Sequence, residues 1–196
     1  MKELNGHILE YFDDEHIYLV DGIIVTSITG MMKLRFGNKY NGISEEVLSR
    51  AAERGTRIHE AVQRYADTGE MDDIPEVRGY RFLERQHGFC ATRTEQPVIL
   101  SHKGIPIAAG RFDLELAEAC RIGGADIKTT STLDREYLAL QLNLYRIANR
   151  QTYDTEWEFL RGIHLRGDTR KYVDIPINEE LTNQFIEEFL KERTEL

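Results

Sequence analysis

Residues 110–130, GRFDLELAEACRIGGADIKTT, contain two runs that favour β-strands around a short polar connection. In the first run Asp113 and Glu115 alternate with apolar residues, so we expect both carboxylates on one strand face. In the second run Asp126 and Lys128 are two residues apart, and their side chains point the same way on a strand. A hairpin-like connection then places Asp113 beside Asp126 and Lys128. Such a group of carboxylates and an ammonium can bind a hard divalent cation and a phosphate.

The flanking segments alternate between helix and strand patterns in an order typical of a mixed sheet with helices on its faces. The Asp21-Gly22 pair predicts a hairpin turn, and Ser27 is a candidate cap for a short helix that follows. We expect longer helices over residues 44–67, 75–87, 133–149 and 179–191. We expect strands within residues 7–25 and over 97–100, 105–108, 111–116, 122–128, 157–165 and 172–177. Ser131 or Thr132 is the expected cap of the third long helix.

Length and composition favour one globular domain. The 196 residues divide into N-terminal strands with a short helix (1–43), a core (44–178) and a C-terminal helix (179–196). The formal net charge of −9 argues against a protein that coats nucleic acid, although a metal held by carboxylates needs basic residues only locally. We find no apolar run of membrane-spanning length, and two isolated cysteines suit a reducing compartment, so we expect a cytoplasmic protein with no membrane partner.

Three further polar residues bear on the D-x-K triplet, which on its own is more often an exposed ion pair. His59 lies at the edge of the apolar face of the first long helix, either as a hydrogen-bonded boundary residue or as a ligand. Gln141 shares a helix face with Tyr145 and apolar residues, so it is either a core hydrogen-bonding group or a site residue. Glu95 is expected to be exposed, with membership of the cluster as the alternative.

Together these residues resemble the RecB-like branch of the PD-(D/E)XK nuclease superfamily. The branch motifs G-x-x-x-H, a Glu before a strand, G-x-x-D, D-x-K-T and Q-x-x-x-Y are matched in order by Gly55–His59, Glu95, Gly110–Asp113, Asp126–Thr129 and Gln141–Tyr145. The match spans nearly half of the chain. The resemblance implies an α/β (α+β) fold with a central mixed β-sheet flanked by helices. This would be a restriction-endonuclease-like core with an added N-terminal β-hairpin and helix.

The resemblance also implies a site for Mg²⁺ or Mn²⁺. The implied metal ligands are His59, Asp113, Asp126 and the backbone carbonyl of Ile127. The implied catalytic residues are Lys128, Asp113, Asp126 and Gln141, with Glu95 and Tyr145 as accessory residues. An iron–sulfur cluster needs about four thiolates. The sequence has only two cysteines, Cys90 and Cys120, so we expect no such cluster. Candidate DNA contacts, chosen for their closeness in sequence to the motifs, are Lys103, Arg111, Arg135 and Arg146. Arg50, Arg54, Arg57 and Arg64 are instead expected to form a solvated, salt-bridged helix face.

The implied function is metal-dependent hydrolysis of DNA, as an exonuclease in recombination, repair or replication. The implied setting is the cytoplasm of a bacterial or phage-infected cell. Candidate partners are DNA and a separate helicase, recombinase or single-strand-binding protein. One alternative is a catalytically inactive relative that binds DNA or a partner protein. Another is a different metal phosphoesterase, which would require H-x-D-type clusters that the sequence lacks.

Overall fold

The computed structural model describes residues 1–12, 17–37, 42 and 44–194. Its strands are β1 (Lys2–Leu4), β2 (His7–Phe12), β3 (Ile17–Val20), β4 (Ile23–Ser27), β5 (Phe89–His102), β6 (Ile105–Glu118), β7 (Arg121–Lys128), β8 (Phe159–Arg166) and β9 (Thr169–Ile175). Its helices are α1 (Ile28–Met31), α2 (Lys33–Phe36), α3 (Glu45–Thr68), α4 (Pro75–His87), α5 (Arg135–Tyr153) and α6 (Glu179–Thr194). The predicted boundary at residue 43 and the predicted strand residues 13–16 lie outside the described ranges.

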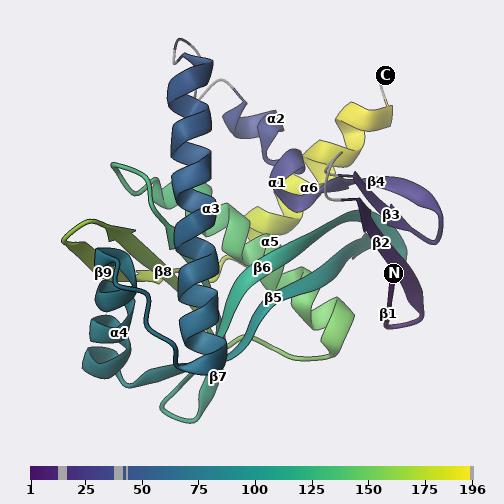
Figure 1. Cartoon of the computed structure of the whole chain (residues 1–196). Helices are drawn as coiled ribbons and strands as arrows, with labels where there is room; N and C mark the ends of the chain where they lie inside the picture. Colours follow the sequence, from purple (N-terminus) through teal and green to yellow (C-terminus); the bar gives the residue numbers. More distant parts are fainter. Residues whose placement is uncertain (13–16, 38–41, 43, 195–196) are drawn as a thin grey trace.

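One mixed sheet connects the strands in the order β1-β2-β3-β4-β6-β7-β8-β9, and β5 pairs with β6. Helices α3 and α4 pack on one face of this sheet, and α5 and α6 pack on the other (Figure 1). The predicted fold class, a mixed sheet flanked by helices, is therefore confirmed. Among the residues described, no helix combines the length and the apolar character that a membrane crossing requires.

Each face of the sheet has its own apolar core. Trp157 and Phe185 are fully buried on the α5–α6 side, and Val62 and Tyr80 are fully buried on the α3–α4 side. Removing a side chain of this size from water stabilises the fold by about 2 kcal/mol. Strand β7 passes close to the indole ring, because a Cβ on Gly124 would lie 2.1 Å from Trp157. The tight packing at Gly124 fixes the strand that leads to Lys128.

The local signals at the N-terminus predict its structure correctly. Asp21 and Gly22 have φ values of 53° and 77°, as the predicted hairpin turn between β3 and β4 requires. The Ser27 hydroxyl accepts a 2.8 Å hydrogen bond from the Gly30 N–H and caps α1. The helix predicted to follow is divided into α1 and α2, with Met32 between them.

Two predictions about element boundaries are wrong. The short strands predicted between residues 97 and 116 are parts of two long strands, β5 and β6, which pair along most of their length. The early half of β5 is rich in polar residues, which hide the alternation that strand prediction relies on. Helix α5 is capped by Asp134, whose carboxylate accepts a 3.0 Å hydrogen bond from Tyr137 N–H, and not by Ser131 or Thr132.

Helix α3 is longer than its packing surface. Its bounds match the prediction within about one residue, but Ala51 and Ala52, which helical spacing places on the apolar face, are exposed. Its fully buried residues are Ile58, Ala61 and Val62, in the second half of the helix. The first half extends away from the sheet in Figure 1. Helical periodicity predicted which side of the helix is apolar, but could not indicate where the sheet beneath it ends.

Candidate metal centre and catalytic site

Strand β6 changes its partner along its length. Near its start it pairs with β4, at Ala108 and Ala109, and towards its end it pairs with β7, from Leu114 to Glu118. Between these contacts, residues 110–113 pair with no described strand on that side of β6. The two neighbouring strands therefore diverge and leave a fork in the sheet, and Asp113 lies where the fork begins.

Asp113 joins three elements at this fork. Its Oδ2 atom accepts a 2.7 Å hydrogen bond from the Ile127 N–H on β7. The same oxygen lies 3.4 Å from Nδ1 of His59 on α3. The structure thus brings the G-x-x-D strand, the D-x-K strand and the G-x-x-x-H helix to one carboxylate. That the backbone carbonyl of Ile127 binds a metal stays a prediction.

Glu95 is the third member of this cluster. One ligand atom each from His59, Glu95 and Asp113 lie within 4.8 Å of one another. The prediction that Glu95 is exposed is wrong, because its side chain is only 23% exposed. It also lies within β5 and not ahead of the strand.

The backbone explains how Glu95 reaches the cluster. Glu95 has a φ of 47°, in the left-handed region, although it lies inside a strand. The pairing of β5 with β6 continues on both sides of Glu95 and Asp113, and these two residues are themselves left out of it. A non-glycine residue in this conformation costs about 1–3 kcal/mol and persists only where its surroundings hold it. Strain at Glu95, which meets His59 in this cluster, is typical of a functional site.

The same irregularity corrects the predicted strand face of β6. Phe112 packs in the core beneath α5, whereas Leu114 packs in the core beneath α3. Strict alternation would place these two residues on one face. Glu115 does not lie beside Asp113. Its side chain is buried and accepts hydrogen bonds from Arg93 and Trp157. Glu115 is therefore a structural carboxylate.

Lys128 is fixed by three side chains next to the cluster. Its Nζ lies 2.6 Å from Oδ2 of Asp126 and donates a 2.8 Å hydrogen bond to Oε1 of Gln141. The ring centroid of Tyr137 lies 5.7 Å from the same nitrogen. The sequence left two roles open for Gln141, a core hydrogen-bonding group or a site residue, and in the structure its side chain is buried and contacts Lys128. The buried Oδ2 of Asp126 has the ammonium as an ion-pair partner but makes no hydrogen bond of ordinary angle.

The electrostatics of the site indicate a deficit of positive charge. Burial, and after it the neighbouring Asp113, raises the pKa of Glu95 to about 7. Burial raises the pKa of Asp126 to about 6, against the opposing effect of Lys128. Burial lowers the pKa of Lys128, but the carboxylates of Asp126 and Asp113 outweigh it, so the net shift is upward. These carboxylates therefore bind protons more readily than usual unless a cation neutralises them.

The donor set fits a divalent cation. Carboxylate oxygens are the ligands that Mg²⁺ prefers, and one imidazole nitrogen extends the range to Mn²⁺. His59, Glu95 and Asp113 would hold the ion, with the incompletely satisfied Oδ2 of Asp126 nearby.

Two glycines of the motifs allow close approach between elements. A Cβ on Gly110 would lie 3.1 Å from the ring of Tyr145 and 3.4 Å from Ile28. Tyr145, predicted as an accessory residue that packs or contacts DNA, is buried here, so it has a packing role. A Cβ on Gly55 of α3 would lie 3.4 Å from the Thr129 hydroxyl, an ordinary contact distance.

We expect Gly110→Ala to lower the free energy of unfolding by about 1–3 kcal/mol, because the added methyl group overpacks against a buried ring. Gly55→Ala is the matched control. It adds the same methyl group at a position with room, and within a helix it stabilises by up to about 1 kcal/mol. Urea denaturation of both variants measures the difference. Equal destabilisation of the two would contradict the packing role assigned to Gly110.

The predicted DNA contacts separate into two groups. Nε of Arg111 lies 2.8 Å from Oε2 of Glu95, so Arg111 is at the rim of the candidate metal site. Arg135 is exposed in the first turn of α5, the helix that supplies Gln141. Contact of either residue with DNA stays a prediction.

The other two predicted contacts lie elsewhere. Arg146 is only 11% exposed and pairs with Glu156 and Glu179, which argues against a contact with DNA. Ion pairing with residues distant in sequence could not be predicted from Arg146 itself. Lys103 lies in the β5–β6 turn, ten residues from Asp113 along β6. At a rise of about 3.3 Å per residue, this distance is roughly 30 Å.

Several residues that support the site were missed. Arg54, expected to be solvated, forms a 2.5 Å ion pair with the buried Glu76 and donates a hydrogen bond to the Thr129 carbonyl. Nε2 of the buried His164 lies 2.7 Å from the Thr130 carbonyl oxygen. These groups hold the backbone that follows Lys128. Since the partners are far apart in sequence, no local pattern indicates them.

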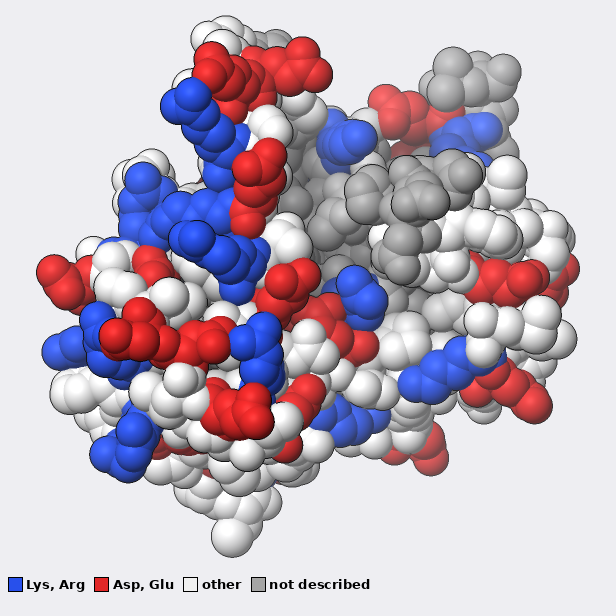
Figure 2. Space-filling view, viewed as in Figure 1, with Lys and Arg blue, Asp and Glu red and all other residues white. Residues whose placement is uncertain are grey.

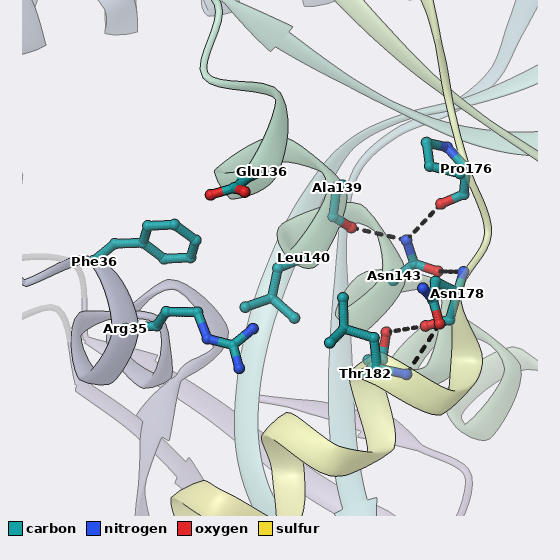
Figure 3. Close-up of a pocket in the computed structure, with 10 residues that line it drawn as sticks. Arg35, Phe36, Glu136, Ala139, Leu140, Asn143, Pro176, Asn178 and Thr182 are labelled. Carbon is teal, nitrogen blue, oxygen red and sulfur yellow. Dashed lines mark hydrogen bonds between the residues drawn. The ribbon is translucent and has the colours of Figure 1, made fainter.

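A separate cavity of about 410 Å³ lies among α2, α5 and α6 (Figure 3). Its central amide, Asn143, donates hydrogen bonds to the carbonyls of Ala139 and Pro176. The same amide accepts a 2.8 Å hydrogen bond from the Asn178 N–H. Asn143 thus joins α5 to the start of α6, and it is satisfied without a ligand.

Comparison with known proteins adds little to this geometry. No family model and no curated protein matches the chain. Among solved structures, the chain is similar to the crystal structure of a protein designated SSO0001, with 14% identity and a TM-score of 0.49. The alignment covers 85% of this chain and 75% of that one. A similarity of this strength does not identify a function.

Proposed function

We propose that this chain is a divalent-metal-dependent deoxyribonuclease of the RecB-like PD-(D/E)XK type. The proposal rests on the convergence of α3, β5, β6, β7 and α5 at one fork of the sheet, where each element supplies a polar side chain. These side chains are His59, Glu95, Asp113, Asp126, Lys128 and Gln141. The buried ion pair and the strained backbone at Glu95 support a functional site over a chance cluster of surface charges.

Each group has a distinct part in this proposal. The chemistry that a bound Mg²⁺ or Mn²⁺ supplies is activation of water and neutralisation of phosphate charge. His59, Glu95 and Asp113 hold the ion at the fork. Lys128 remains an ammonium because its pKa is raised, so it orients and stabilises the phosphate and does not act as a general base. Asp126 and Gln141 fix the position of this ammonium.

The resemblance supplies the setting of the proposed activity. We propose DNA as the substrate and exonuclease action in recombination, repair or replication, in the cytoplasm of a bacterial or phage-infected cell. A separate helicase, recombinase or single-strand-binding protein is the proposed partner class.

The test is digestion of end-labelled linear and circular DNA, single- and double-stranded, with Mg²⁺, Mn²⁺ or EDTA. We expect cleavage that requires metal, and a shifted Mn²⁺ titration in His59→Ala. The matched control is His102→Ala, since His102 and His59 have similar side-chain exposures of 25% and 28%. Cleavage that persists in EDTA, or that responds equally to both replacements, would contradict the assignment.

A further inference from the structure

A groove of about 760 Å³ lies between the first half of α3 and the loop that follows β7. Figure 2 shows basic side chains along α3, on the left of the view, with acidic side chains beside them. The residues that line the groove are Val47, Leu48, Arg50, Ala51, Arg54, Thr129, Thr130, Ser131, Thr132, Asp134 and Arg166. The overhang of α3 forms one wall, which explains why this half of the helix lies clear of the core.

The groove combines three kinds of lining. The guanidinium groups of Arg50 and Arg166 can contact phosphate oxygens, whereas Arg54 is paired with the buried Glu76. Hydroxyl side chains of residues 129–132 also line the groove; that of Thr130 donates to the Thr132 carbonyl, and the other three add neutral hydrogen-bond donors. Val47, which is 55% exposed, and its neighbours on α3 give an apolar surface for bases.

Arg54 is committed to the buried Glu76, whereas Arg50 and Arg166 remain available to a ligand. Asp134 lines the groove, but its carboxylate caps α5. Arg50 pairs with Glu46, and both side chains are largely exposed, so this pair is weak and easily exchanged for a phosphate. Arg166 donates one hydrogen bond to the Thr129 carbonyl, and its side chain is exposed.

The groove lies next to the candidate site, since its lining residue Thr129 follows Lys128 in the chain. The Thr129 hydroxyl also lies against Gly55, about one helical turn before His59 on α3. Lys128 and Asp126 are recessed, with side-chain exposures of 21% and 3%. A phosphate must therefore enter the fork to reach them. The volume of the groove falls within the range of about 300–1,000 Å³ typical of small-ligand pockets, which suits a few nucleotides of one strand. A base-paired duplex keeps its bases stacked inside the double helix, so they cannot lie against the apolar surface of α3.

We propose that this groove binds a single DNA strand beside the scissile phosphate, so that the protein takes single strands or frayed ends in preference to closed duplex. The catalytic consequence rests on the proposed nuclease function. Occupation of the groove is a binding property that exists without cleavage.

The first experiment measures binding in EDTA by fluorescence anisotropy, with labelled oligo(dT) and with a hairpin duplex. We expect the Arg50→Ala/Arg166→Ala variant to lose about tenfold in affinity for oligo(dT), with a salt-dependence slope lowered by about 1.4, since each lost phosphate contact on a single strand contributes about 0.7. The matched control, Arg81→Ala/Arg85→Ala, removes two arginines that line a different hollow on α4, and should bind normally. Equal losses in both variants, or tighter binding of the duplex, would overturn the proposal.

The second experiment places a reporter in the groove and remains informative if the arginine variants fold poorly. The one natural tryptophan, Trp157, is fully buried and gives a constant background. We expect oligo(dT) to quench the fluorescence of Val47→Trp and to leave that of Phe82→Trp, on the exposed face of α4, unchanged. If oligo(dT) binds to saturation and the fluorescence of Val47→Trp is not quenched, the assignment of this groove as the binding site is wrong.

The two proposals can fail separately. If oligo(dT) quenches Val47→Trp but wild type cleaves no DNA with any metal, the nuclease function fails and the groove stands. If wild type cleaves DNA with metal but Val47→Trp is not quenched, the nuclease function stands and the groove fails.

Discussion

Lys128→Met is expected to reduce single-turnover DNA cleavage by about 100-fold or more, the loss typical of one preorganised electrostatic group. Lys128 is held by Asp126 and Gln141 and stays charged at working pH. Its replacement therefore removes a fixed positive charge from the position of the phosphate. Lys128→Arg keeps the charge but not the compact geometry, so we expect partial recovery at most. Wild-type rates in Lys128→Met would refute the catalytic assignment.

The same replacement changes stability, and a second variant separates this effect from the chemistry. Removing Lys128 leaves Asp126 buried without its ion-pair partner, which costs about 3–5 kcal/mol when the carboxylate is charged. The double variant Lys128→Met/Asp126→Asn carries no buried charge at this pair and should regain most of that stability. Urea denaturation at pH 8 measures both variants. We expect the double variant to fold well and still fail to cleave.

Glu95→Gln is expected to stabilise the metal-free protein at pH 8 by about 2–3 kcal/mol while it weakens metal binding. Folding raises the pKa of Glu95 from 4.5 to about 7, mainly through burial. A group with a raised pKa contributes stability below its unfolded value, and this contribution is lost as the pH rises through the folded value. Wild type in EDTA should therefore lose stability between about pH 4.5 and pH 7, and Glu95→Gln should lose less.

Denaturation curves in EDTA across this pH range test the prediction, and calorimetric titration with Mn²⁺ tests the effect on metal binding. Glu118→Gln is a suitable control. Hydrogen bonds from Arg161 and Tyr172 outweigh burial and lower the pKa of Glu118, so its replacement should destabilise at pH 8. Parallel pH profiles for wild type and Glu95→Gln would show that Glu95 does not titrate in the cluster.

The sequence by itself determined the features that depend on neighbours along the chain. The Asp21-Gly22 turn, the cap at Ser27 and the bounds of α4 between Pro75 and Gly88 follow from local backbone preferences. The spacing of Asp126 and Lys128 also fixed their common direction, because side chains on a strand alternate. These features can be predicted without knowing which distant segments pack against them.

The energetic balance at the site depends on tertiary contacts. From the sequence, repulsion between two carboxylates predicts that Asp126→Ala leaves the fold intact or slightly more stable. In the structure Asp126 is the ion-pair partner of the buried Lys128, so its removal should destabilise instead. The sign of the effect depends on burial and pairing, and neither is encoded in the residue type.

The tertiary structure alone decided which candidates meet. Glu95 enters the cluster because its strand bends through a left-handed residue at the fork, a conformation that its local sequence does not favour. Arg146 and Arg54 are held by carboxylates distant in sequence, so their charges serve the fold. The groove exists because α3 extends past the sheet that buries its second half. Each outcome depends on contacts between distant segments, whereas periodicity and spacing report only on residues close together in the chain.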